Sequence, residues 1–289
     1  MSAAASTTVE MRPGGLWLAF RDNRIAWVGL VLLALIVLVA ILAPLLAPYD
    51  PLEQNLVARL EPPSAEFWLG TDSYGRDVLS RLIYGARISL FVGFVAILVA
   101  MVVGTTIGVV AGYVGGVFDQ IVMGALDVLL AFPTLLLGLM IAAMLGASLE
   151  NLIIAIAVTE VAPFARVARA PTITLRQRDF VEASRSYGCG PFRIMFRHIL
   201  PNMLSDVVVM SSLWLASAIR TEASLSFIGL GVPPPAATWG GMIREGFENI
   251  LDAWWLAVFP SLAILATVLA LNLLGDALRD ASDPRTRAR

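Results

Sequence analysis

Three uncharged stretches, each long enough to cross a lipid bilayer, constrain this chain more than any other feature. They cover residues 25–47, 88–114 and 253–274. A helix rises about 1.5 Å per residue, so the shortest would be about 33 Å long, and the hydrocarbon core of a bilayer is about 30 Å thick. A cleaved signal peptide explains the first stretch poorly, because its apolar region has only about 7 to 15 residues. The sequence therefore predicts an all-α membrane protein.

Three further stretches are apolar but carry charges. Hydrophobic residues make up 58% of the chain and charged residues 15%, a balance that excludes an ordinary soluble enzyme. Leaving these stretches outside the bilayer would expose large apolar runs to water, so we predict six transmembrane helices in total. The three stretches are residues 121–149 with Asp127, residues 151–165 with Glu160 and Pro163, and residues 207–230 with Arg220 and Glu222.

The four ionisable residues in these stretches, Asp127, Glu160, Arg220 and Glu222, are candidates for a translocation pathway. Charge at membrane depth is costly and usually faces a water-filled cavity or a partner group. A second interpretation stays open for the last two, which can lie near the outer interface. Two residues apart, they point to different faces of a helix and need not pair with each other.

The arginines divide unequally between the two sides of the predicted bundle. All 20 basic residues are arginines, and 14 of them fall within residues 1–24, 166–203 and 275–289, against five on the opposite side. Cytoplasmic segments are enriched in basic residues, so both termini are predicted to be cytoplasmic. The predicted organisation is a cytoplasmic segment at 1–24, a first transmembrane helix at 25–47, an external loop at 48–87 ending in an interfacial helix at 78–87, a five-helix core at 88–275 with a cytoplasmic loop at 166–203, and a cytoplasmic tail at 276–289.

Three glycines recur at intervals of four in the second predicted span: Gly104, Gly108 and Gly112. Small residues at this spacing let two helix backbones approach closely in lipid. We therefore predict a helix-packing seam here rather than a ligand site.

The sequence offers few residues or motifs that could serve catalysis or metal binding. The chain has no lysine, so it lacks the P-loop lysine that contacts nucleotide phosphates, and any ATP must be hydrolysed by another subunit. One cysteine, Cys189, and one histidine, His198, make an internal disulfide or a structural metal site a poor expectation. Neither HExxH nor GxSxG occurs. We expect no enzyme, no metal, no cofactor and no nucleic-acid partner for this chain itself.

The cytoplasmic loop at residues 166–203 is too long for a simple turn and carries seven arginines. Residues 179–187 favour a helix that Gly188 ends, and Gly190 with Pro191 starts a second short helix running to Pro201. Such a device can dock a partner protein. It can equally rest as an amphipathic helix on anionic lipid, and the composition leaves both interpretations open.

The same loop resembles the "EAA" coupling motif of ABC importer permeases. Glu182, Ala183 and Ser184 stand at the EAA positions, with serine in place of the third alanine. Gly188 follows, and then His198, Ile199, Leu200 and Pro201, with histidine at a position that is isoleucine in the motif. Three other stretches are similar to the C-type permease subunit of the dipeptide, oligopeptide and nickel importer family, so that the resemblance extends from Arg21 to Pro284. They are residues 69–81, 225–231 and 272–280.

This resemblance implies a type I ABC importer permease fold in the bacterial inner membrane, with a coupling helix that inserts into a cytoplasmic ATPase. The implied partners are a second homologous permease subunit, two ATPase subunits or one fused chain that bind ATP and Mg²⁺, an extracytoplasmic substrate-binding protein and membrane lipid. A peptide, a nickel complex or another small solute would be the cargo. Two other classes remain as alternatives: an ion-coupled secondary transporter, in which Asp127, Glu160 or Glu222 carries protons, and an assembly scaffold.

Overall fold

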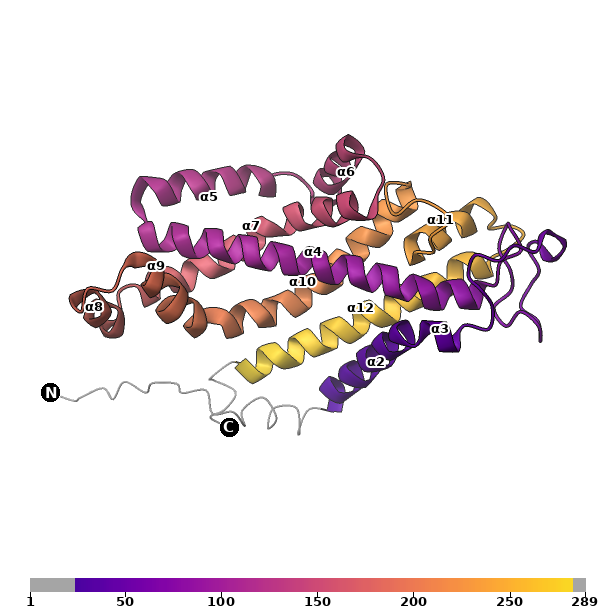
Figure 1. Ribbon diagram of the computed structural model, residues 1–289, viewed down its shortest axis with the longest axis horizontal. Coiled ribbons are helices and arrows are strands. Elements are labelled where there is room, and N and C mark those ends of the chain that lie inside the picture. The colour runs from indigo at the N-terminus through magenta and orange to yellow at the C-terminus, as the bar shows by residue number, and fades with distance from the viewer. Residues whose placement is uncertain (1–23, 283–289) are drawn as a thin grey trace.

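The computed structural model describes residues 24–282, which form an elongated bundle of helices (Figure 1). Within these residues there is no β-strand, only an isolated antiparallel bridge between Thr71 and Asp77, so the predicted all-α class is confirmed. The expected segments at residues 1–23 and 283–289 lie outside this range. In chain order the helices are α2 (Arg24–Ile41), α3 (Ala43–Leu46), the 3₁₀ turn η1 (Leu56–Ala58), α4 (Val78–Val114), α5 (Gly116–Leu130), α6 (Thr134–Leu145), α7 (Leu149–Leu175), α8 (Asp179–Ser186), α9 (Pro191–Arg193), the π-helical turn η2 (Ile194–Ile199), α10 (Leu200–Ile228), α11 (Trp239–Glu248) and α12 (Trp255–Ser282).

Five helices between residues 24 and 282 are long and apolar enough to cross a membrane: α2, α4, α7, α12 and the continuous helix Pro191–Ile228. The α5 and α6 helices pass the same test only together, and they bend by 90° at the break between them. If this bent pair counts as one span, the total is six, the number that the sequence predicts.

The interfacial helix expected at residues 78–87 is instead the first part of α4, which continues for 37 residues. The Asp77 side chain caps its start, accepting a hydrogen bond of 2.7 Å from the backbone N–H of Ser80. No proline interrupts the helix, and it ends where Gly115 adopts a φ of 70°. The loop that precedes α4 therefore ends at Asp77, and α4 begins directly after it.

The third predicted span, residues 121–149, is broken and also starts earlier than expected. The α5 helix begins at Gly116 and ends at Leu130, and Pro133 precedes α6. Proline has no backbone N–H and disfavours the helical conformation in the residue before it, which favours a break at Phe132 and Pro133. The chain turns sharply at this point.

The fourth predicted span, residues 151–165, is too short. The α7 helix begins at Leu149 and continues past residue 165 to Leu175, with Pro163 and Pro171 inside it. Its start is capped by Ser148, whose Oγ accepts a hydrogen bond of 3.1 Å from the Asn151 N–H. Residues 166–175, which the sequence assigns to a loop, are therefore helical, and the connection to the next helix begins at Arg176.

The glycines of α4 explain why α7 stays helical for so long. A Cβ atom on Gly104 would lie 2.5 Å from the Val161 carbonyl oxygen, and one on Gly112 would lie 3.0 Å from that of Arg169. The two backbones therefore touch along several turns, which confirms the predicted packing seam. Packing along this seam stabilises α7 beyond the end of its apolar run.

The second cytoplasmic helix, expected to stop at Pro201, does not stop there. The π-helical turn η2 joins α9 to α10, with the Leu200 N–H bonded to the Met195 carbonyl oxygen, and α10 continues to Ile228. The wider turn changes the hydrogen-bond pattern just before Pro201, and this accommodates the missing proline N–H.

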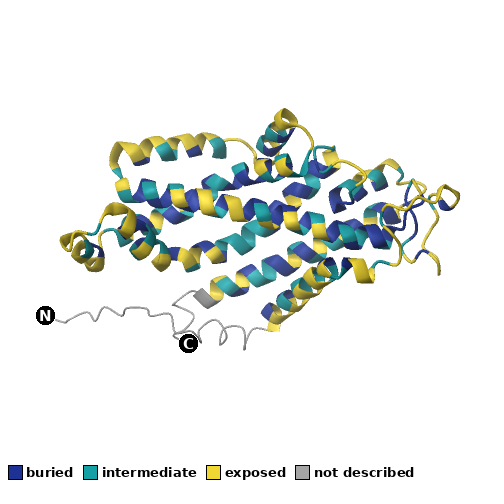
Figure 2. Ribbon diagram, in the orientation of Figure 1, coloured by how far each residue is buried: buried dark blue, intermediate teal, exposed yellow. Residues whose placement is uncertain are grey.

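Burial follows the contacts among the long helices (Figure 2). The main core lies between α4, α7 and α10 and includes Val92, Phe164 and Leu225. By contrast, α2 and α5 expose large apolar side chains, such as Val31 at 61% and Ile121 at 67% of their surfaces. A membrane or another membrane subunit would cover such surfaces.

Candidate functional site

The segment between α7 and α10 carries the residues that resemble a coupling motif. It lies at the opposite end of the molecule from residues 48–77 (Figure 1). The α8 helix spans Asp179–Ser186, as the sequence predicts. Val181 anchors it, because this side chain is fully buried in the main core, together with Ile194 and Ile199.

Gly188 ends α8 in the left-handed conformation, with a φ of 79°. The Cys189 N–H donates to the Ser184 carbonyl oxygen at 3.0 Å, and the Gly188 N–H donates to that of Arg185 at 2.9 Å. This pair of bonds is the Schellman motif, and the predicted helix end is confirmed. A Cβ atom at Gly188 would meet nothing within 4 Å, so the backbone conformation, not a close contact, calls for glycine.

The remaining motif residues divide between the surface and the core. Glu182 and Ala183 are exposed, and the Ser184 hydroxyl donates to the Phe180 carbonyl oxygen at 2.8 Å. On the second part of the motif, Ile199 is fully buried, Pro201 is exposed, and His198 and Leu200 are half-buried. The first part is therefore presented outward, and the second part fixes it to the bundle.

Exposed aromatic side chains lie on α8 and in the residues that follow it. Phe180, Tyr187 and Phe192 have 41%, 88% and 72% of their surfaces accessible. The guanidinium of Arg185 lies 5.3 Å from the ring centre of Tyr113 at the end of α4, which ties α8 to that helix. Apolar groups presented among charges are typical of a surface that a partner covers.

Asp127, the first of the four ionisable candidates, pairs with Arg166 at 2.6 Å, and both side chains are more than half exposed. A second ion pair joins the same two helices, α5 and α7, where Arg169 contacts Asp119 through two hydrogen bonds of 2.5 and 2.6 Å. From the sequence, Arg166 and Arg169 are expected in a loop, and Asp119 is not predicted as a site residue. The sequence signal for these ion pairs is that opposite charges occur in or beside two neighbouring apolar stretches.

The other three candidates separate into a buried group and an exposed one. Glu160 is buried on α7, where it interacts with Ser217 and Arg220 of α10, and Arg220 itself is exposed. Glu222 is inaccessible to solvent and accepts a hydrogen bond of 2.8 Å from Ser226. The different faces predicted for Arg220 and Glu222 are confirmed.

Glu222 lies where three helices meet. Ser89 of α4 interacts with its carboxyl group and also accepts a hydrogen bond from the Trp239 backbone N–H at the start of α11. The geometry therefore gives Glu222 a role in joining α4, α10 and α11. The carboxyl group itself is inaccessible, while its hydrogen-bond partner Ser226 lines a cavity near residues 48–77.

A buried ion cluster holds residues 48–77 against α11. Asp72 contacts Arg76 at 2.6 Å and Arg81 at 3.1 Å, and none of the three side chains is more than 6% accessible. Glu245 of α11 contacts Arg76 at 3.4 Å and accepts a hydrogen bond from the Ser73 hydroxyl. The first stretch of family resemblance contains Asp72, Arg76 and Arg81, but Glu245 was missed because it joins them only through the fold.

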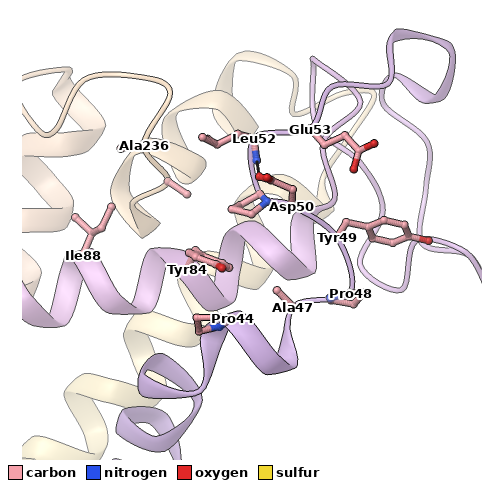
Figure 3. A pocket seen from close by; sticks show the side chains of 12 residues that line it. Pro44, Ala47, Pro48, Tyr49, Asp50, Leu52, Glu53, Tyr84, Ile88 and Ala236 are labelled. Carbon is pink, nitrogen blue, oxygen red and sulfur yellow. Dashed lines mark hydrogen bonds between the residues drawn. The ribbon is translucent and has the colours of Figure 1, made fainter.

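Cavities open on the described surface, and three of them are large. Two lie near residues 48–77, with volumes of about 690 and 650 Å³, and the third, of about 540 Å³, lies between α5 and α7. Figure 3 shows the first, with Pro44 next to α4, Tyr84 on α4, and Ala236 on the connection between α10 and α11. Among residues 24–282, no three His, Cys, Asp or Glu side chains group closely enough to hold a metal.

Comparison with known proteins places this geometry in a family. Residues 104–288 match the family described as "binding-protein-dependent transport system inner membrane component", and residues 15–63 match the N-terminal transmembrane domain of oligopeptide transport permease C. The dipeptide transport system permease protein DppC of Alkalihalophilus pseudofirmus is 43% identical over 93% of this chain and 88% of its own length. The di/tripeptide permease DppC of Pseudomonas aeruginosa is 44% identical over 94% and 91%.

Another relative carries a different name, the glutathione transport system permease protein GsiD of Shigella flexneri. It is 45% identical over 94% of this chain and 90% of its own length. Among solved structures, the inward-facing MetNI methionine ABC transporter has a chain of similar fold, with a TM-score of 0.57 and 18% identity, covering 70% of this chain and 97% of that one. This likeness supports the fold alone and agrees with the predicted importer-permease fold.

The alternatives of a secondary transporter and an assembly scaffold fall away with these matches, which cover most of the chain. This multi-pass protein belongs to the family of inner-membrane components of binding-protein-dependent transport systems, the permeases of ABC importers.

Proposed function

We propose that this permease forms half of the translocation pathway for di- or oligopeptides and couples it to ATP hydrolysis on other chains. The partners would be a second homologous permease subunit, two cytoplasmic ATPase subunits or one fused chain, and an extracytoplasmic binding protein. The peptide cargo is proposed because two relatives of more than 40% identity are named as dipeptide or di/tripeptide permeases. The glutathione permease, also named for a peptide, supports the same class of cargo.

The observation that carries the coupling proposal is the geometry of α8. This helix is anchored by Val181, closed by Gly188, and surrounded by the exposed rings of Phe180, Tyr187 and Phe192. An outward-facing helix with a fixed end can transmit a rigid-body movement of a partner to α10, because Val181 packs in the same core as Ile199 just before that helix. Glu182, exposed on α8, would offer a carboxylate to a basic side chain of an ATPase.

The proposed orientation places α8 and both termini in the cytoplasm and residues 48–77 outside. Arginines support it: Arg176, Arg178, Arg185, Arg193 and Arg197 gather around α8. In this orientation the buried ion cluster of Asp72, Arg76 and Arg81 lies on the external side, where it would give the binding protein a fixed surface to meet.

We keep Asp127, Glu160 and Arg220 as proposed pathway residues, because charges in membrane-spanning helices usually face water or a partner. Glu222 is less suited to this role, since its carboxyl group is sealed between three helices. The chain itself is proposed to bind neither ATP nor Mg²⁺. Its lack of lysine supports this assignment.

Reconstitution tests the proposal. The purified permease alone is expected to hydrolyse no ATP, whereas proteoliposomes with all partners should take up labelled dialanine only when ATP and the binding protein are present. In the same system, Glu182→Ala should reduce uptake while Glu182→Gln, which keeps hydrogen-bonding capacity, should reduce it less. Robust ATP turnover by the isolated chain, or unchanged uptake by Glu182→Ala, would contradict the coupling assignment.

A further inference from the structure

The cavity between α5 and α7 has a polar wall at a depth where lipid does not tolerate charge. Gln120, Gly124 and Asp127 follow one another at helical spacing along α5 and line it, and Arg166 and Arg169 of α7 form the facing wall. We call Gln120, Gly124 and Asp127 the polar stripe. The Asp127–Arg166 ion pair is a well-exposed part of this wall, with 54% and 55% of the two side chains accessible in the isolated chain.

The depth of the ion pair follows from α4. Its uncharged run, residues 88–114, is about 40 Å long as a helix, about 10 Å more than the hydrocarbon core. Gly108 packs against Ala165, so neighbouring Arg166 lies level with a point about 9 Å from the inner end of that run. Asp127 lies about 17 Å along α5 from Gly116, closer still to the middle of the bilayer.

A half-exposed ion pair at this depth has two acceptable surroundings: water or another protein surface. The cavity favours water. Its volume of about 540 Å³ is within the range of pockets that hold small molecules, roughly 300 to 1,000 Å³, and four of its six lining residues are polar or charged. Ile121 and Ala125 are exposed on a different face of α5, whereas Val117 and Val128 border the polar stripe.

We propose that the polar stripe and Arg166 line the water-filled part of the translocation pathway, where they provide counter-ions for a zwitterionic peptide. The carboxylate of Asp127 would meet the peptide ammonium group, and the guanidinium of Arg166 would meet the terminal carboxylate. Because the two side chains neutralise each other when no peptide is present, neither charge is left bare in the membrane. This inference rests on the proposed peptide-permease function and names the residues that the cargo passes.

Gly124 makes the proposal testable, because a Cβ atom there would meet nothing within 4 Å. The variant combines Gly124→Cys with Cys189→Ser, since Cys189 is the chain's single native cysteine. The matched control is Ala125→Cys in the same background, an exposed apolar position at the same depth on a different face of the helix. Both are assembled with their partners in proteoliposomes and treated with an anionic, membrane-impermeant methanethiosulfonate.

The Gly124→Cys variant is expected to react at least about tenfold faster than the Ala125→Cys control, because only an aqueous surface admits the charged reagent. The adduct should block uptake of labelled dialanine while the ATPase subunits remain bound. If the thiol of the Gly124→Cys variant stays unreactive with and without ATP, the polar stripe faces the second permease subunit or lipid, and the proposal is wrong. This result does not depend on which solute is carried.

A second measurement concerns the charges. The double variant Asp127→Asn with Arg166→Gln should lower the maximal rate of dialanine uptake by about tenfold, the scale expected when a charged contact is lost, without changing the apparent KM set by the binding protein. The control neutralises the more buried pair, Asp119→Asn with Arg169→Gln, and should act on assembly instead. An unchanged maximal rate in the first variant would overturn the counter-ion role. Failure of the unmodified complex to take up dialanine would refute the peptide cargo, while the thiol reactivity of the Gly124→Cys variant would still decide the lining of the pathway.

Discussion

The backbone carbonyl oxygen of Ala165 in α7 lies directly against Gly108 of α4, in the space that any side chain on residue 108 would need. The neighbouring turns repeat the arrangement, with Gly104 against Val161 and Gly112 against Arg169. The ion pair between Asp127 and Arg166, which we propose lines the pathway, is attached to this seam through α7. The seam must therefore stay intact for Asp127 and Arg166 to keep their position along the membrane normal.

Gly108→Ala should destabilise the permease by about 1–3 kcal/mol, because the added methyl group collides with backbone that cannot move aside. The matched control is Gly124→Ala, where the space is open and the change should be neutral or slightly stabilising. Thermal unfolding of the assembled complex in detergent measures both. Equal melting temperatures for the two variants would show that the seam tolerates a side chain.

Features governed by local rules could be predicted from the sequence. Uncharged runs identified the firm spans, the four-residue glycine spacing identified the seam, and Gly188 identified the end of α8. Each depends on residues close together in the chain. A helix end in the left-handed conformation needs glycine whatever the rest of the molecule does, and the φ of 79° at Gly188 meets that expectation.

Features that depend on tertiary contact could not be predicted in this way. Pro163, Pro171 and Pro201 all suggest helix ends, yet packing against α4 and a π-helical turn carry the helices past them. The ion-pair partners of Asp127 and Arg76 could not be predicted from the sequence for the same reason. Arg166 is 39 residues away from Asp127, and Glu245 is 169 residues away from Arg76, so only the fold brings them together.

The ion cluster beside residues 48–77 gives a second prediction. Asp72→Ala leaves Arg76 and Arg81 buried without their shared carboxylate, and breaking a buried pair in this way costs about 3–5 kcal/mol. Limited proteolysis should then cut residues 48–77 faster than in the unaltered protein. The control is Glu248→Ala, which removes an exposed ion pair with Arg244 and should cost about 0–1 kcal/mol. If Asp72→Ala resists protease and heat as well as Glu248→Ala does, the cluster does not hold this loop.

The orientation can be tested with one native and one introduced cysteine. Leu251 lies between α11 and α12 and is 96% exposed, so Leu251→Cys in a Cys189→Ser background should react with an impermeant maleimide in spheroplasts. Native Cys189, beside the end of α8, should react only after the membrane is opened. Labelling of Cys189 in sealed spheroplasts would reverse the proposed orientation.

The last prediction concerns how α8 transmits movement. Gly188→Val forces a β-branched residue into the left-handed region, at a cost of roughly 1–2 kcal/mol, so the Schellman end of α8 should loosen. The control is Gly190→Val, since Gly190 has an ordinary φ of −67° and equally open space around it. Gly188→Asn, which tolerates the left-handed conformation better, should be intermediate. In proteoliposomes with all partners, Gly188→Val should hydrolyse ATP with much less dialanine uptake per ATP, whereas Gly190→Val should keep the normal ratio. Because both substitutions add the same side chain two residues apart on the same surface, equal ratios would mean that the fixed end of α8 does not matter for coupling, and the segment would then have to be interpreted as a helix resting on the membrane surface.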